Sequence, residues 1–476
     1  MDSVDLFLRL PRPLRQSVVV GTGLRNRLLR YGRSYRRTLA LLAESETWPE
    51  ERHEALQARR LFELLTEARH GTDFYHESLA SIPPSEMVDL AAGLDLGALP
   101  LLEKTTLKQE TVRFDNQKRR AVARSSTSGS TGSPLEVSYD RESLQISFAF
   151  LHRQRIWLGL GAWPRAIRLS GRQLVSSTTL QPPFWLSNPF ERQLLVSTYH
   201  LRRDTLQPIT ERLRRFAPTV IEGYPSAIRT LGEGVERHGG LPTVRAIIST
   251  AETVTPDIRE RIERAFAAPL FDYYSASEGV PFIQQCEHGG LHMRPESGIF
   301  EVLDPEGRAV PRGNPGELVV TSFRQWKTPL IRYRTGDSIV LPGLDSPCPC
   351  GRTLPLVQEI LGRQEDFVET PDGRSIGMFA YRTLKHIVGL REAQIVQTAT
   401  ATFKVNATLD GSRAHADIHS DLRAVFERVL GFPPSVELKI CDSIPRGPAG
   451  KFRAVVRAFE ATSPAAKRTI GEPRDE

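Results

Sequence analysis

The sequence predicts a two-part α/β protein, in which a large domain with a mostly parallel sheet precedes a small α+β domain. From about residue 120 to residue 340, short apolar runs alternate with helical segments, which is typical of parallel strands joined by crossover helices. After residue 361 the pattern changes to short strands around two helices. We therefore place the domains at 1–361 and 362–476, and expect 1–110 to be a mostly helical lead-in.

The expected elements of the large domain follow from the spacing of apolar residues. In the lead-in, helical spacing predicts a helix over Gln57–His70 that is ended by Gly71. In the alternating region we expect strands at Arg165–Leu169, Val244–Ser249 and Glu317–Ser322, and helices at Leu206–Arg215 and Pro256–Phe266.

The small domain is predicted to start with a hairpin around Pro371–Arg374. The elements expected after it are a helix at Phe379–Ile387, strands at Gln394–Ala399 and Thr402–Leu409, a helix at Ala416–Leu430 and a strand at Val436–Cys441. The last dozen residues, rich in charge and proline, are expected to form a loose tail.

Composition excludes several classes of protein. The 63 basic residues and 56 acidic residues are interspersed, so the net charge of +7 does not predict a nucleic-acid partner. We interpret the basic run Arg25–Arg37 as a solvated amphipathic helix, with a membrane-surface or nucleic-acid patch as the alternative. No apolar run reaches the ~18 residues of a membrane span, and the start of the chain is unlike a secretory signal. Four cysteines in so long a chain indicate a reducing compartment, so we expect a cytoplasmic protein.

The run Ser125–Pro134 is the strongest local signal of function. Nine of its ten residues are Ser, Thr or Gly, so glycine backbone and hydroxyl groups could point several donors at one anion. Strand-like residues flank the run, which favours a strand–loop–strand phosphate cradle over the alternative of a flexible linker. It lacks the Gly-Lys-Ser/Thr ending of a Walker loop.

Four further motifs follow this run in the chain. They are Tyr273–Gly279, Tyr333–Asp337, Gly362–Asp366 and Pro445–Lys451. The carboxylate of Asp337 could accept hydrogen bonds from two vicinal hydroxyls, although a turn-forming aspartate is the simpler interpretation of that residue alone. Lys451 is one of nine lysines and could neutralise a developing phosphate charge, although an isolated lysine in such a loop would be read as a surface residue.

Taken in order, the five motifs resemble those of the adenylate-forming, acyl-activating enzymes. Three more segments, Glu222–Ser226, Cys286–His292 and Cys348–Arg352, resemble the phenylacetate–CoA ligase-like branch, which includes proteins associated with capsule biosynthesis. The resemblance implies a large adenylation domain with a mobile C-terminal lid and a site in the cleft between them.

The resemblance also implies a role for each matching residue. The residues expected to bind ATP or AMP are Ser128, Gly129, Ser130, Thr131, Gly132, Tyr274, Ser277, Asp337 and Arg363. Tyr274 would stack on adenine, and Asp337 and Arg363 would hold the ribose or a phosphate. Glu278 would help to hold Mg²⁺, Lys451 would be catalytic, and Glu365 would be the hinge.

The sequence departs from the family pattern at three positions. Ser133 stands where the phosphate loop commonly has lysine, Ser275 where glycine is usual, and Glu365 where the hinge more often has Asp or Lys. The first departure weakens the charge expected at the pyrophosphate. All three leave the adenylation assignment in place but affect the expected rate and acceptor.

Three of the four cysteines lie with histidine and glycine in two short segments. We predict that Cys286, His292, Cys348 and Cys350 hold a structural Zn²⁺, which takes four such ligands tetrahedrally. His288 is a rival ligand to His292, and turn cysteines without metal are the alternative. Such a zinc would join two loops and would not act in catalysis.

The expected activity is ATP-dependent conversion of a small carboxylic acid to an acyl-adenylate, followed by transfer to coenzyme A. A second hypothesis is transfer to an amine or hydroxyl of another metabolite, and a third is an inactive scaffold, against which Glu278, Asp337 and Lys451 argue together. Tyr224, Trp157 and Phe184 could line the acyl pocket or lie in the core. The sequence indicates neither the acid nor the oligomeric state.

Overall fold

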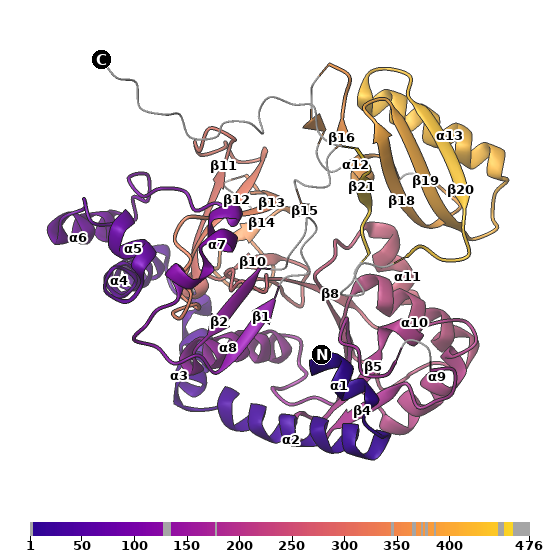
Figure 1. Ribbon diagram of the computed structural model, residues 1–476, viewed down its shortest axis with the longest axis horizontal. Coiled ribbons are helices and arrows are strands. Elements are labelled where there is room, and N and C mark those ends of the chain that lie inside the picture. The colour runs from indigo at the N-terminus through magenta and orange to yellow at the C-terminus, as the bar shows by residue number, and fades with distance from the viewer. Residues whose placement is uncertain are drawn as a thin grey trace. The chain divides into compact units, whose positions relative to one another are not determined.

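The structure is a computed structural model that describes residues 3–126, 135–176, 179–343, 347–363, 368–372, 375–376, 379–384, 387–445 and 452–459. The chain divides into two compact units (Figure 1). The first unit contains Met1–Ile360, and the second begins at Leu361.

The first unit begins with helices. They are α1 (Ser3–Arg9), α2 (Arg12–Arg30), α3 (Arg33–Glu44), η1 (Ser45–Thr47), α4 (Glu50–Gly71), α5 (Asp73–Ser78), α6 (Pro84–Gly93), α7 (Lys104–Gln109) and η2 (Thr111–Phe114). Helix α4 contains the segment predicted at Gln57–His70 and ends at Gly71.

The basic run Arg25–Arg37 is split between two helices, so its interpretation as one amphipathic helix was wrong. The break between α2 and α3 is held by the side chain of Gln145. Its amide nitrogen donates to the carbonyl of Leu29 at 2.9 Å, and its oxygen accepts from the backbone nitrogen of Tyr35 at 3.3 Å. Gln145 thus satisfies the end of one helix and the start of the next.

A nine-stranded sheet with the order β14-β10-β9-β8-β7-β6-β3-β5-β4 forms the centre of the first unit. The strands are β3 (Ala166–Ser170), β4 (Trp185–Asn188), β5 (Gln193–Ser197), β6 (Val220–Gly223), β7 (Ala246–Thr250), β8 (Leu270–Tyr274), β9 (Ile283–Gln285), β10 (Leu291–Met293) and β14 (Leu356–Val357). The neighbours β5, β3, β6, β7 and β8 run parallel, and the outer strands run antiparallel.

Both faces of the parallel strands are buried, as their continuous apolar runs predict. On one face, Ile167, Ile221 and Ile247 pack in a core with helices α9 (Leu206–Phe216), α10 (Pro225–Arg237) and α11 (Pro256–Phe266). On the other face, Val220 and Ile248 pack against the chain that follows α8 (Arg141–Trp157). The short helices η3 (Pro189–Glu191) and η4 (Thr198–His200) flank β5.

A second sheet in the first unit has the order β11-β12-β13-β15. Its strands are β11 (Gly298–Leu303), which follows η5 (Pro295–Ser297), β12 (Pro315–Ser322), β13 (Tyr333–Val340) and β15 (Glu359–Arg363). A separate hairpin pairs β1 (Ala123–Ser126) with β2 (Glu136–Tyr139) in antiparallel register. This hairpin supplies the two strands expected on either side of the Ser/Thr/Gly-rich run.

The second unit is an α+β structure around a four-stranded sheet with the order β20-β19-β18-β21. Its elements are β16 (Val368–Glu369), β17 (Ser375–Ile376), α12 (Phe379–Leu384), β18 (Leu390–Ala399), β19 (Thr402–Leu409), α13 (His415–Leu430), β20 (Ser435–Ile440) and β21 (Val455–Arg457). Phe379, Phe403 and Phe426 meet at the centre of its core.

The predicted fold class is confirmed: a large α/β part is followed by a small α+β part. Alternating apolar runs marked the parallel strands because those strands are buried on both faces. Among the described residues, no helix combines the length and the apolar character needed to cross a membrane.

Candidate functional site

Polar side chains meet at the carboxyl end of β8, beside strand β13. Tyr274 is the last residue of β8, and its hydroxyl donates a 2.8 Å hydrogen bond to Oδ2 of Asp337 on β13. Gly336, with φ of 73°, allows the turn of the backbone just before Asp337. Burial and the Asp337 carboxylate raise the pKa of Tyr274 well above its usual value, so the phenol stays protonated as a donor.

The carboxylate of Glu278 lies in the same region and is 2% exposed. Its Oε1 atom is 3.4 Å from Nζ of Lys104 and accepts a hydrogen bond from the Tyr333 hydroxyl, also at 3.4 Å. The chain turns sharply at Gly279, where φ is 101° and an added Cβ would approach Gln325 to 3.0 Å. One cation and one phenol therefore offset the burial of this charge.

Strand β2 also reaches this region. Its last residue, Tyr139, donates a 2.9 Å hydrogen bond to the carbonyl of Ser277, and the Ser277 side chain is exposed. Because β2 follows the Ser/Thr/Gly-rich run directly, this contact places the chain leaving the run beside the residues expected to bind nucleotide.

Ser275, which stands where the family pattern has glycine, is tied into the loop after β8. Its hydroxyl donates to the carbonyl of Val280 at 3.1 Å and accepts from Nη1 of Arg324 at 2.8 Å. The Arg324 guanidinium lies 3.9 Å from the ring centroid of Phe282. The serine thus anchors the loop through a cation, which a glycine could not do.

Several expected site residues lie outside the described part of the chain. These are Ser128, Gly129, Ser130, Thr131, Gly132, Ser133, Glu365 and Lys451. Arg363 ends strand β15, and its side chain is not described. The residues that the structure does bring together are Tyr274, Ser277, Glu278 and Asp337.

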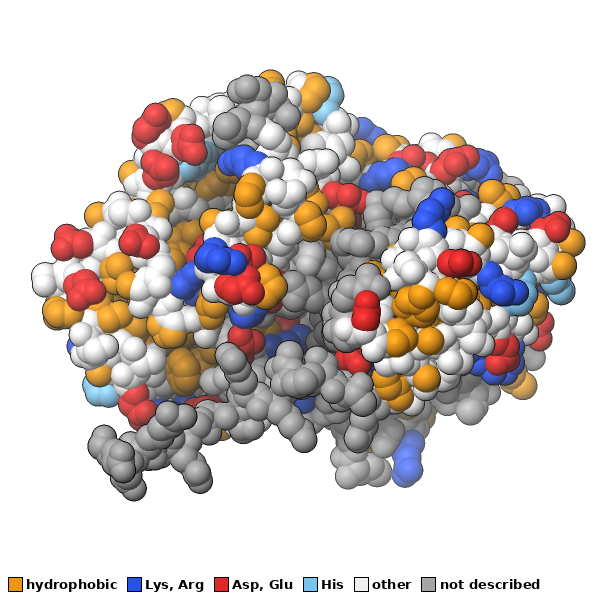
Figure 2. Space-filling view, turned by 90° about the horizontal axis from the view of Figure 1, so that it is seen from above, with side chains coloured by type: hydrophobic (Ala, Val, Ile, Leu, Met, Phe, Trp, Pro, Cys, Tyr) orange, Lys and Arg blue, Asp and Glu red, His pale blue; other side chains and the backbone are white. Residues whose placement is uncertain are grey.

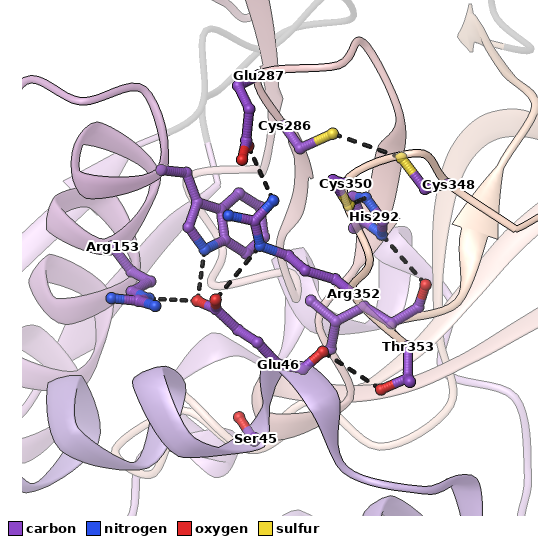
Figure 3. Close-up of polar contacts among 12 residues, drawn as sticks. Ser45, Glu46, Arg153, Cys286, Glu287, His292, Cys348, Cys350, Arg352 and Thr353 are labelled. Atoms are coloured by element: carbon purple, nitrogen blue, oxygen red, sulfur yellow. Dashed lines mark hydrogen bonds and ion pairs between the residues drawn. The ribbon is translucent and has the colours of Figure 1, made fainter.

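A second group consists of Cys286, His292, Cys348 and Cys350, called here the Cys/His cluster (Figure 3). One ligand atom from each residue lies within 4.8 Å of the others. The Sγ atoms of Cys286 and Cys348 are 3.6 Å apart, and Sγ of Cys350 is 3.4 Å from Nε2 of His292. His288 is exposed and lies outside this cluster.

The distances in the Cys/His cluster fit a tetrahedral metal site. Bonds of about 2.3 Å to sulfur and about 2.0–2.1 Å to nitrogen give a tetrahedron whose edges are about 3.5–3.8 Å. Nδ1 of His292 is 3.1 Å from the carbonyl oxygen of Leu354, which fixes the ring and leaves Nε2 facing the cysteines. Burial lowers the pKa of His292 to about 4, so the imidazole is neutral at pH 7.

Ion pairs surround the Cys/His cluster and join it to the helical lead-in (Figure 3). The carboxylate of Glu46, in η1, accepts from Arg153 and from Nε of Arg352. Arg352 also donates to Glu287 at 2.8 Å, and its guanidinium lies 4.4 Å from the ring centroid of Trp157. These contacts hold the two cysteine-bearing loops against η1 and α8.

Sequence reasoning missed Lys104 and Glu46. Neither residue belongs to a motif, and each reaches its site from a distant helix, so no local signal could have found it. Of the aromatic residues considered for the acyl pocket, Trp157 packs in the core cluster that contains Cys286 and Cys348, and Phe184 stacks on His200 within the core. Tyr224 follows β6 and precedes α10.

Two family models match the chain. Residues 192–324 match the AMP-binding enzyme family, and residues 368–458 match the CapK C-terminal domain. The protein CapK of Staphylococcus aureus is 25% identical over 84% of this chain and 88% of its own length. The phenylacetate–coenzyme A ligase of Thermus thermophilus is 27% identical over 82% of this chain and 85% of its own length.

Solved structures share the fold. A 2-hydroxyisobutyryl–CoA ligase, crystallised in the postadenylation state with 2-HIB-AMP, has a TM-score of 0.70 and 22% sequence identity. The match covers 87% of this chain and 91% of that one. The likeness extends over the arrangement of strands and helices described above.

Proposed function

Because the chain belongs to the adenylate-forming superfamily, in the branch of CapK and the phenylacetate–coenzyme A ligases, we propose that it is an AMP-forming acid–thiol ligase. It uses ATP to convert a small carboxylic acid to an acyl-adenylate, and then transfers the acyl group to coenzyme A. The observation that carries the proposal is the convergence of Tyr274, Glu278 and Asp337 at the end of β8. In open α/β sheets, ligands bind at the carboxyl ends of parallel strands.

The Tyr274–Asp337 pair is suited to a nucleoside. The Tyr274 ring offers an apolar face for the adenine base, and such stacking contributes about 1–3 kcal/mol per base. The carboxylate of Asp337 has two oxygens, of which Oδ2 already accepts from Tyr274. A carboxylate can accept several hydrogen bonds, so the ribose hydroxyls can bind without displacing the tyrosine. Arg363 is proposed as a further ribose or phosphate contact.

The phosphates are proposed to lie between Ser277 and the residues Ser128–Gly132. In the first step, a carboxylate oxygen of the acid attacks the α-phosphorus, the bond to the β-phosphate breaks, and pyrophosphate leaves. Lys451 is proposed to stabilise the extra negative charge on the α-phosphate in the transition state. This step requires no proton transfer, because the acid is ionised at neutral pH.

Glu278 fits a magnesium ligand. Mg²⁺ prefers one or two carboxylates together with phosphate oxygens, and Glu278 is an acceptor with a single lysine as its charged neighbour. When bound, the ion would neutralise phosphate charge. The role of Lys104 is to offset the buried carboxylate, since its Nζ lies 3.4 Å from Oε1.

In the second step, the thiol sulfur of coenzyme A attacks the acyl carbon, AMP leaves and the thiol proton is released to solvent. We propose that rotation of the second unit about Glu365 moves Lys451 away from the acyl-adenylate and opens a path for the thiol. An amine or hydroxyl acceptor is the second candidate. The match of residues 368–458 to a domain named for CapK, and not for a coenzyme A ligase, is the observation that favours it.

The Cys/His cluster is proposed to hold one structural Zn²⁺. The support is its donor set, its distances of 3.4 Å and 3.6 Å, and the contact of Nδ1 of His292 with the carbonyl oxygen of Leu354. Four protein ligands close the coordination sphere, so the site is structural. The ion would join the loop at Cys286 to the turn at Cys348–Cys350.

Acid-dependent ATP–pyrophosphate exchange tests the first step. A panel of aromatic, aliphatic and hydroxylated acids is expected to contain acids that drive exchange. For each acid that drives exchange, AMP release is then measured in the presence of coenzyme A. The same measurement is made separately with amine and hydroxyl acceptors. Exchange without coenzyme A-dependent AMP release would favour the second candidate. Absence of exchange with every acid, in protein that binds ATP, would contradict adenylation.

A further inference from the structure

Helix α2 turns an apolar stripe outward. Leu14, Val18 and Leu28 are 52%, 44% and 65% exposed, and Leu24 is also exposed. Positions 14, 18, 21 and 28 are four, three and seven residues apart, which are whole turns of a helix, and they therefore share one helix face. Four turns of helix thus present large aliphatic side chains to solvent, which is costly without a partner.

The opposite face of α2 is fixed to the first unit, so the stripe cannot turn inward. Gly23 packs so closely on Asn188 that an added Cβ would lie 2.1 Å from Oδ1. Gln16 donates to the carbonyl of Ser187 at 2.7 Å and accepts from its backbone nitrogen at 3.0 Å. Figure 1 shows α2 lying beside β4, along the lower edge of the view.

The charge around the stripe has one sign. Residues 6–43 contain nine arginines and no acidic residue. Elsewhere the signs are mixed, and Figure 2 shows acidic and basic side chains interspersed over the face that it presents. The segment that carries the stripe is therefore a local positive patch on a chain of modest net charge.

A cationic groove adjoins the start of α2. Arg12, Arg212 and Arg215 line it together with Glu211, Trp185 and the Pro182–Pro183 segment. Among the described residues, none of these three arginines forms an ion pair. Burial and the neighbouring cations Arg215 and Arg165 lower the pKa of Arg212. The groove thus carries three basic side chains and one acidic side chain, and this net positive charge favours an anionic ligand.

We propose that α2 docks the protein on the surface of an anionic lipid bilayer. The apolar stripe would lie at the level of the acyl chains, and Arg12, Arg212 and Arg215 would bind headgroup phosphates. Helix α2 combines exposed apolar residues with arginines, and α9 adds Arg212 and Arg215 beside the start of α2. Apolar and cationic residues together are the combination that interfacial helices use. The proposal is independent of the adenylation activity.

Two other occupants fit less well. A second copy of the chain, packed through the same stripe, would bring arginine against arginine with no acidic residue to pair with. A nucleic acid would satisfy the arginines but would leave Leu14, Val18 and Leu28 without an apolar partner.

Vesicle co-sedimentation tests the proposal with the full chain. Vesicles of phosphatidylcholine with 40% phosphatidylglycerol are expected to bind the protein, and pure phosphatidylcholine vesicles to bind it far less. The triple variant Leu14→Ser, Val18→Ser, Leu28→Ser is expected to lower the partition coefficient more than about tenfold. The variant Arg12→Gln, Arg212→Gln, Arg215→Gln should lower the partition coefficient about fivefold for each arginine removed. This decrease should be smaller in high salt.

Matched variants on other surfaces control for general effects. Val112→Ser removes a more exposed apolar side chain, and Arg264→Gln removes an exposed arginine on α11; neither is expected to change vesicle binding. The melting temperature of each variant checks that it folds. Equal binding of the wild type and the triple serine variant to anionic vesicles would overturn the proposal. The proposal would also be overturned if sedimentation velocity showed a wild-type dimer that the triple serine variant dissociates. Tighter binding to a DNA duplex than to the anionic vesicles would overturn it as well.

Discussion

The two polar groups of the first unit, the Tyr274–Asp337 region and the Cys/His cluster, differ in how accessible their members are. In the first, Ser277 is exposed and Asp337 is half-buried, so a ligand can reach both side chains. In the second, donors face each other at 3.4 Å and 3.6 Å and are enclosed by ion pairs. Accessible side chains suit a ligand that enters and leaves. Four enclosed ligand atoms suit an ion that stays bound.

The largest expected effect is on the rate of the adenylation step, and not on ATP binding. Lys451→Ala should lower the rate of acid-dependent pyrophosphate exchange by about 10²–10³, because one preorganised charge on the transition state is lost. ATP binding and the melting temperature should stay nearly unchanged. Lys439→Ala, which removes an exposed lysine of β20, is the control. Unchanged exchange in Lys451→Ala would remove this lysine from the mechanism.

The next effect tests whether the open region holds a ribose. Asp337→Ala should weaken ATP binding by about 1.5–3 kcal/mol, the range for hydrogen bonds to a charged group. Isothermal titration calorimetry with ATP measures this, and Asp204→Ala, at an exposed ion pair, should bind ATP as the wild type does. The ribose role is wrong if the two variants have the same affinity.

A substitution in the Cys/His cluster is expected to lower the stability of the protein, and not its affinity for ATP. Purified protein should carry about one zinc per chain, and Cys348→Ser should lose it. The melting temperature should fall, by about 2–4 °C for each kcal/mol of lost stability, because the metal binds the folded state. ATP affinity should be kept, and Cys441→Ser, outside the cluster, should retain zinc. A zinc content near zero in untreated wild type, measured without chelators, would end this proposal.

The smallest effect is expected at Tyr274. Tyr274→Phe keeps the ring that would stack on adenine and removes the hydrogen bond to Asp337. The freed Oδ2 can accept from the ribose instead, so ATP affinity should change by less than about fivefold, which is under about 1 kcal/mol. A loss as large as that of Asp337→Ala would mean that the hydroxyl, and not the ring, is what the nucleotide needs.

The sequence could predict what local pattern controls. The parallel strands were recognisable because burial on both faces requires continuous apolar runs, as at Ala166–Ser170 and Ala246–Thr250. The Cys/His cluster was recognisable because residue types that can bind a metal gather in two short segments, and His292 lies inside the cluster. Motif order likewise pointed to Tyr274 and Asp337 before their contact was seen.

What the sequence could not predict depends on distant partners. The break between α2 and α3 is set by Gln145, which is 116 positions from Leu29. The Lys104–Glu278 pair joins a helix of the lead-in to a loop after β8, and no periodicity relates them. The outward stripe of α2 was not predicted, because sequence alone does not say which face of a helix is covered.

The link between η1 and the cysteine-bearing loops has a consequence for how the protein is made. Thr353 donates to the carbonyl of Glu46 across 307 positions, and Ser45 donates to Glu296 across 251. Contacts of such long range form late and slow folding, because a long loop must close first. On the ribosome, the helical lead-in emerges long before its partners are synthesised. The part of the lead-in that these contacts cover therefore stays exposed until the chain has been synthesised as far as Thr353.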